Sequence, residues 1–167
     1  MNATTDSNER PAPLWRRLLA LVYELLVVLA ILLVTVQVCR LLTRGQLNPH
    51  AWWFRALLLV VVEAYFVASW VRGGQSLGMR AWRLYLRSAD GGTPDLARAL
   101  LRFVIVASPM LLLALAWVAG IGVALAAPFV AWALDLAVAA FDPRRRALHD
   151  MLAGTWIAYR PAPADQG

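Results

Sequence analysis

An uninterrupted run of 32 residues without a charged side chain, from Phe103 to Leu134, constrains the fold of this chain more than any other feature. A helix needs about 20 apolar residues to cross a bilayer, so the run is too long for one untilted span and about right for two. Near its middle, the glycine-containing sequence at 119–122 is the natural hairpin. The sequence therefore predicts membrane helices over approximately 96–118 and 122–141.

Two further apolar stretches complete a set of four predicted spans. Residues 15–39 carry Glu24 well inside the stretch, and residues 52–71 carry Glu63 near the middle. The composition agrees, because 61% of the 167 residues are apolar and 16% are charged, against about 45–50% and 25% in water-soluble domains. This balance excludes a soluble globular domain, and we expect an all-α membrane protein with four transmembrane helices.

The two ends of the chain differ from this apolar body. Residues 1–13 and 160–167 are polar and contain proline, so they have little apolar area to bury and are expected to be disordered tails. Between them, residues 14–159 form one predicted membrane domain. Near its end, residues 155–159 alternate in the manner of a β-strand.

The connection between the second and third spans carries a basic pattern. Arg80, Arg83 and Arg87 recur at the spacing i, i+3, i+7, which predicts an amphipathic helix within residues 72–89, lying on the membrane with these arginines against lipid headgroups. The preceding glycine-rich sequence at 73–78 is read as a helix C-cap and bend. A phosphate-binding P-loop would need a preceding strand and GxxxxGK[ST], neither of which is found there.

The positive charge is distributed by compartment. All 16 basic residues are arginine, and the formal net charge is +6, which by itself would suit a nucleic-acid-binding protein. With four spans, however, 13 arginines fall on the side of both termini, whereas Arg40, Arg44 and Arg55 fall on the other side. The positive-inside rule then predicts a multi-pass plasma-membrane protein with both termini in the cytoplasm. The basic composition is explained without nucleic acid as a partner.

Three carboxylates lie within predicted spans: Glu24, Glu63 and Asp135. An acid at the centre of a membrane helix costs about 2.5–3.5 kcal/mol on insertion scales, so these side chains should face the bundle and be paired or protonated. Two interpretations stay open. The acids either fix helix packing through hydrogen bonds, or they relay protons or cations with Glu24 as the functional carboxylate and the other two as its partners.

The remaining candidates lie near the ends of the chain. Arg17 is seven residues before Glu24, about 10.5 Å along a helix, so we expect it to contact a headgroup phosphate or an acid elsewhere, such as Asp150. His149 and Asp150 lack a companion nucleophile motif and are expected to act as a cap or ion pair. The single cysteine, Cys39, excludes an internal disulfide and a cysteine-based zinc site. We expect no metal and no cofactor.

Three segments together resemble the RDD family of bacterial membrane proteins. They are RRLLALVYELL at the start, GGQSLGMRAWRLYLRSADGGTPDLARALLRF in the middle and DPRRRALHDMLAGTWIAY at the end, and the resemblance covers roughly residues 14–159. The family is named for an arginine at the mouth of the first span, an aspartate within it and a later aspartate. These positions correspond to Arg17, Glu24 and Asp150, with Glu24 departing from the family by one methylene. The resemblance implies an inner-membrane protein and suggests transport, including sodium–proton exchange.

Two functions follow as hypotheses. The first is transport or ion exchange by the intramembrane carboxylates; because four spans are few for a pathway, it predicts a homo-oligomer. The second is a non-catalytic membrane scaffold or regulatory factor that binds a partner protein or anionic lipid through its arginine-rich segment. An intramembrane enzyme ranks last for want of a nucleophile motif. Convergence of the acids on one hydrated cavity would favour transport, and separate pairs shielded from lipid would favour a scaffold.

Overall fold

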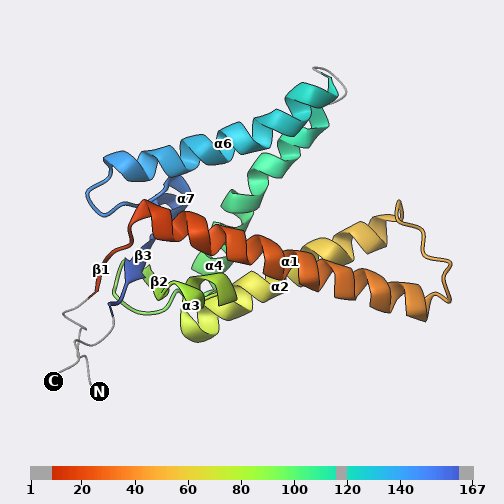
Figure 1. Cartoon of the computed structure of the whole chain (residues 1–167), viewed down its shortest axis with the longest axis horizontal. Coiled ribbons are helices and arrows are strands. Elements are labelled where there is room, and N and C mark those ends of the chain that lie inside the picture. Colours follow the sequence, from red (N-terminus) through yellow and green to blue (C-terminus); the bar gives the residue numbers. More distant parts are fainter. Residues whose placement is uncertain (1–8, 116–119, 162–167) are drawn as a thin grey trace.

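Four long apolar helices dominate the computed structural model, which describes residues 9–115 and 120–161 (Figure 1). Each is long and apolar enough to cross a membrane, as the sequence predicts. The spans are α1 (Leu14–Leu42), α2 (Trp52–Gly73), α4 (Leu96–Ala107) with the 3-10 helix η1 (Ser108–Leu115), and α6 (Ile121–Phe141). The third span changes from α-helix to 3-10 helix at Ser108, next to Pro109, which lacks an N–H to donate. The predicted end of this span at Val118 and the hairpin residue Ala119 lie outside the described residues.

The surfaces of these helices are apolar and open. Leu25 and Leu33 of α1 are 70% and 61% exposed, and about a tenth of the most apolar stretch of α1 is buried within the protein. A water-facing helix would bury such side chains. These exposed apolar side chains therefore form the surface that lipid covers.

A small antiparallel sheet gathers at one end of the helices, where both ends of the described chain lie (Figure 1). It consists of β1 (Arg10–Pro11), β2 (Leu84–Ser88) and β3 (Thr155–Tyr159), in the order β1-β3-β2. The alternation at 155–159 predicts β3 correctly, whereas an all-helical chain was otherwise expected. We call this region the sheet end. Because β1 and β3 pair directly, the two ends of the described chain lie at the same end of the long helices.

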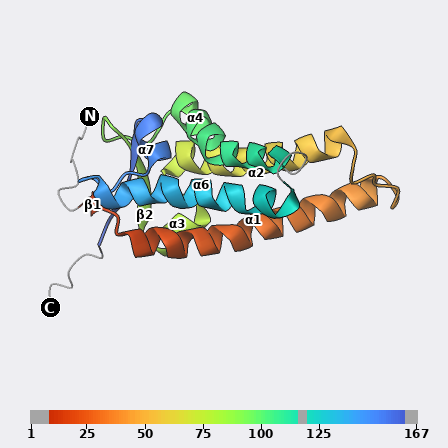
Figure 2. The same ribbon diagram turned by 90° about the horizontal axis from the view of Figure 1, so that it is seen from above.

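The main core lies beneath the sheet rather than along the membrane spans. Leu84 and Leu86 of β2 and Ile157 of β3 pack with Trp70 of α2 and Met79. In β2 the residues alternate between buried and partly exposed, as a strand with one covered face should. Two short helices, α3 (Leu77–Ala81) and α7 (Leu148–Leu152), lie with the strands at this end of the long helices (Figure 2).

The prediction of an amphipathic helix within residues 72–89 is wrong for the second half of this segment. The chain forms only the short helix α3 (Leu77–Ala81), turns at Arg83 with φ +55°, and continues as β2. The turn separates Arg80 from Arg87, so the arginines do not form a helical stripe. The reason is tertiary: β3 supplies the backbone hydrogen bonds that draw residues 84–88 into a strand.

The polar segment before α1 is also more ordered at its end than its composition indicates. Ala12 is fully buried, and its N–H donates to the carbonyl of Ile157 at 3.0 Å. The carboxylate of Glu9 accepts from Arg87 at 2.7 Å and from Arg160 at 2.9 Å. These contacts fasten residues 9–12 to the sheet, because β3 offers partners that the local sequence does not reveal. Residues 1–8 and 162–167, the outer parts of the predicted tails, lie outside the described residues.

A glycine ends α2 where the chain turns back toward the sheet. Gly74 has φ +64°, and its N–H donates to the carbonyl of Trp70 at 2.9 Å. A Cβ at this position would lie 2.8 Å from the carbonyl oxygen of Leu86. The glycine-rich sequence after the second span is thus a C-cap, as expected, and it also lets β2 approach the end of α2.

Candidate functional site

Asp150 is the centre of a buried cluster of charged side chains at the sheet end. It lies in the short helix α7 (Leu148–Leu152) and is completely buried. Its Oδ2 accepts from Nη1 of Arg17 at 3.0 Å and from the N–H of Ala147 at 3.0 Å. Its Oδ1 accepts from Nη1 of Arg102 and lies 3.4 Å from Nε2 of His149. These four contacts use the full acceptor capacity of the carboxylate.

The two arginines come from different membrane helices. Arg17 is in the first turns of α1 and Arg102 is in α4, and they are 4% and 5% exposed. Arg102 also donates to the hydroxyl of Thr155 at 3.2 Å, and its guanidinium lies 5.1 Å from the ring centroid of Trp70. The cluster therefore ties α1, α4 and β3 to α7. Of the alternatives expected for Arg17, a headgroup phosphate or an acid such as Asp150, the structure shows the contact with Asp150.

The protonation of Asp150 follows from these neighbours. Burial on its own would raise the pKa of the carboxyl group, but the charges of Arg102 and Arg17 and the contact with His149 outweigh it and hold the pKa well below its usual range. Nε and Nη2 of Arg17 and Nε of Arg102 are buried and have no hydrogen-bond acceptor among the described residues. Asp150 is thus an ionised carboxylate that compensates two poorly solvated cations.

His149 links this cluster to the fourth span. Its Nδ1 lies 2.5 Å from Oδ2 of Asp135 in α6, and its backbone N–H donates to Oδ1 of Asp135 at 2.9 Å. Because its other ring nitrogen faces Asp150, the imidazole lies between two carboxylates. Asp135 is therefore a paired intramembrane acid, and its partner comes from α7 rather than from Glu24.

Glu24 has a separate set of partners, all around the start of α3. Its Oε1 accepts from the N–H of Gly78 at 2.7 Å, and its Oε2 accepts from the hydroxyl of Tyr65 at 2.9 Å. The same Tyr65 hydroxyl accepts from the N–H of Leu77 at 3.1 Å. Glu24 and Tyr65 thus satisfy two N–H groups of the first turn of α3, which would otherwise lack acceptors.

The contact with Glu24 depends on a glycine. A Cβ on Gly78 would lie 2.5 Å from the backbone oxygen of Ala20 and 2.7 Å from Oε1 of Glu24. Real side chains do not approach this closely, so only glycine lets α3 lie directly against α1 with the Gly78 N–H directed at the carboxylate. This close approach explains how an acid one third of the way along a membrane helix is accommodated.

The other predicted site residues are not brought to either cluster. Glu63 is half-buried in α2, and no hydrogen bond or ion pair joins its side chain to another residue in the described part of the chain. Arg80 and Arg83 are exposed, while Arg87 pairs with Glu9 instead of facing lipid. No group of three or more His, Cys, Asp or Glu residues within 9–115 and 120–161 is placed to hold a metal ion.

Sequence reasoning missed several members of the two clusters. Arg102 was counted only toward the orientation of the protein, although its position one turn after Arg98, at the edge of the uncharged run, marks an arginine that enters the membrane helix. Tyr65 and Gly78 carry no signal of their own, because each acts through a contact with α1 that is remote in sequence.

One of three comparisons with known proteins finds a match to this chain. The model of the RDD family matches residues 11–154, which include Arg17, Glu24 and Asp150. Neither the curated proteins nor the solved structures contain a match to the chain. With most of its length matched, from the end of β1 to the end of α7, this four-span chain belongs to the RDD family.

Proposed function

We propose that the protein is a non-catalytic membrane factor, with both termini in the cytoplasm, whose sheet end forms a rigid platform for a partner at the membrane surface. One observation carries this proposal: the paired acids of the spans hold elements of the platform. Glu24 holds α3 against α1, and Asp135 holds α7 against α6. The excess of arginines at this end supports a cytoplasmic orientation in the plasma membrane.

The separation of the acids also favours a platform over an ion pathway. The partners of Glu24 belong to α2 and α3, whereas those of Asp135 and Asp150 belong to α1, α4 and α7. A relay needs groups that exchange partners, while Asp150 already accepts all the contacts that a carboxylate can.

Proton-coupled ion exchange is the second candidate, and one observation favours it. The imidazole of His149 lies between the carboxylates of Asp135 and Asp150 and joins a membrane span to the sheet end. With four spans, such an exchanger would need to work as a homo-oligomer.

Reconstitution into vesicles that contain a pH-sensitive dye, under imposed sodium or potassium gradients, separates the two candidates. The platform proposal expects no gradient-driven proton movement. In that case Glu24→Gln changes only stability, by no more than the about 1–2 kcal/mol of an interhelical hydrogen bond. Flux that is lost in well-folded Glu24→Gln or His149→Gln would overturn the proposal in favour of exchange. Size-exclusion profiles that match the wild type serve as the control for folding.

A further inference from the structure

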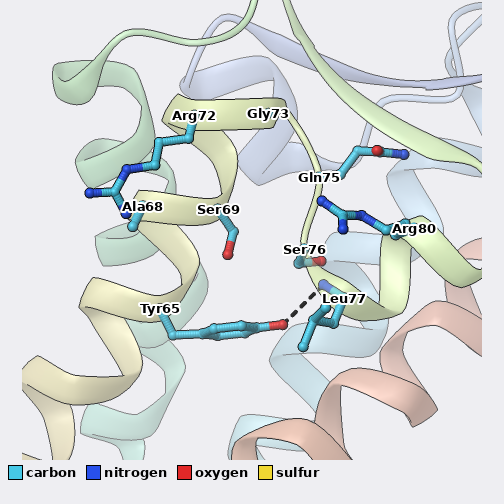
Figure 3. Close-up of a pocket in the computed structure, with 9 residues that line it drawn as sticks. All are labelled: Tyr65, Ala68, Ser69, Arg72, Gly73, Gln75, Ser76, Leu77 and Arg80. Carbon is cyan, nitrogen blue, oxygen red and sulfur yellow. Dashed lines mark hydrogen bonds between the residues drawn. The ribbon is translucent and has the colours of Figure 1, made fainter.

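A pocket of about 410 Å³ lies between the last part of α2, from Tyr65 onward, and the start of α3 (Figure 3). Its polar lining consists of Tyr65, Ser69, Arg72, Gln75, Ser76 and Arg80. This volume falls within the range of small-ligand sites in proteins. The pocket is separate from the Asp150 cluster, and of the groups around Glu24 it shares Tyr65 and Leu77.

The charged side chains that line this pocket are positive and have no ion-pair partner among the described residues. Arg72 and Arg80 are its two ionisable groups besides Tyr65, and no carboxylate lines it. Their side chains form no ion pair or hydrogen bond with any residue that the structure describes. By contrast, Arg87 pairs with Glu9, and Arg98 pairs with Asp90. Arg80 therefore offers the pocket a free guanidinium group that can bind a phosphate oxygen pair, and Arg72 adds a second positive charge at its edge.

Two hydroxyl groups add neutral donors. Ser76 is 2% exposed, and its hydroxyl has no hydrogen-bond partner among the described residues, nor does that of Ser69. In Figure 3 the guanidinium of Arg80 extends back toward Ser76. The side chain of Arg72 points the other way, away from the loop that carries Gln75 and Ser76. The Ser76 hydroxyl is therefore free to donate to an anion held by Arg80.

The depth of the pocket indicates where such an anion would come from. The 22 residues of α2 extend about 33 Å, close to the thickness of the hydrocarbon core. Arg72, one residue before the end of this helix, therefore lies at the level of the lipid headgroups. Lipids that cover the apolar surface of the spans have their headgroups at this same level.

We propose that the pocket between α2 and α3 binds the phosphate group of an anionic lipid headgroup, with Arg80 as the main ligand, Arg72 at the rim and the Ser76 hydroxyl as a neutral donor. This site rests on the proposed function and names the partner of the platform. It differs from a general attraction of arginines to the membrane, because it assigns binding to Arg80 and none to Arg83, an exposed arginine that does not line the pocket.

Binding of a fluorescently labelled phosphatidylglycerol to the full chain in neutral detergent tests the site, with energy transfer from tryptophan as the signal. Arg80→Gln should weaken binding about tenfold, as expected for loss of a charge-assisted contact. Arg72→Gln should weaken it less. Arg83→Gln makes the same change in net charge and should bind as the wild type does. Equal binding by the Arg80→Gln and Arg83→Gln variants would overturn the site.

Competition identifies the source of the phosphate. Unlabelled phosphatidylglycerol should displace the labelled lipid, whereas inorganic phosphate and glycerol 3-phosphate at millimolar concentration should not. Displacement by the soluble phosphates would overturn the assignment to lipid. A failure in these assays leaves the vesicle flux result unchanged, so the lipid site and the platform function fail independently.

Discussion

Substituting Gly78 by alanine tests the contact between α1 and α3 directly. The new Cβ would lie 2.5 Å from the backbone oxygen of Ala20 and 2.9 Å from Cγ of Glu24. A relaxed carbon–oxygen contact is about 3.3–3.6 Å, and the carbonyl of Ala20 cannot move without distorting α1. The start of α3 must therefore shift outward by about 0.8 Å or more, on the same contact distance. This shift stretches the 2.7 Å hydrogen bond from Gly78 to Glu24 beyond its useful range.

The expected cost follows from these two effects. Overpacking costs about 1–3 kcal/mol and the lost hydrogen bond about 1 kcal/mol, so we expect Gly78→Ala to lower the free energy of unfolding by about 2–4 kcal/mol. Trp82, which directly follows α3, reports the shift because its ring lies 5.8 Å from that of Trp15 and 6.2 Å from that of Tyr23.

The assay is unfolding in mixed micelles with increasing dodecyl sulfate, followed by tryptophan fluorescence. Gly73→Ala is the matched control, because a Cβ there meets nothing within 4 Å and Gly73 ends α2 without a positive φ. It should be neutral or stabilise the helix by up to about 1 kcal/mol. Identical unfolding midpoints for the two variants would refute the close approach of α3 to α1.

Three further predictions concern the charges and the topology. Asp150→Asn leaves two buried arginines without their carboxylate and should cost about 3–5 kcal/mol in the same unfolding assay; a loss below about 1 kcal/mol would contradict the pairing. Contacts with Arg146 lower the pKa of Asp142 to about 2, below about 3.9 in the unfolded chain. Its stabilisation is thus complete above about pH 4 and lost as the pH falls toward 2, so unfolding midpoints of wild type and Asp142→Asn should converge across this window, and a constant difference would count against it. Reporter fusions at Gln46 and after Arg160 should report the periplasm and the cytoplasm respectively, and a periplasmic signal from the second fusion would reverse the proposed orientation.

The spans could be predicted because their signal is local. An uncharged run of 32 residues fits nothing but membrane helices. The contact of Arg17 could be predicted only as one of several alternatives, because seven acids lie outside the spans on its side of the membrane and a headgroup phosphate would serve as well. The fold selects Asp150 from among them.

The platform could be predicted only in part, because strand pairing depends on partners far along the chain. Leu84, Leu86 and Ser88 do alternate as buried residues of β2, but the spacing of Arg80, Arg83 and Arg87 competes with that pattern and indicates a helix. Pairing with β3, some 70 residues later, decides the outcome.

The partners of Glu24 could not be predicted from the sequence, for a different reason. Its Oε1 accepts from a backbone N–H, a group that every non-proline residue carries and that no sequence pattern marks. Only the absence of a side chain at Gly78 hints at a close neighbour. That signal cannot identify which helix approaches.

The position of β3 in the middle of the sheet sets the order in which the protein can be completed during synthesis. β1 and β2 pair with β3 and not with each other, so both wait with unpaired backbone groups until the segment after the fourth span has been made. The Asp150 cluster waits for the same segment, because α7 immediately precedes β3. A nascent chain with three inserted helices therefore carries two strands without their partner and two arginines, Arg17 and Arg102, without their carboxylate.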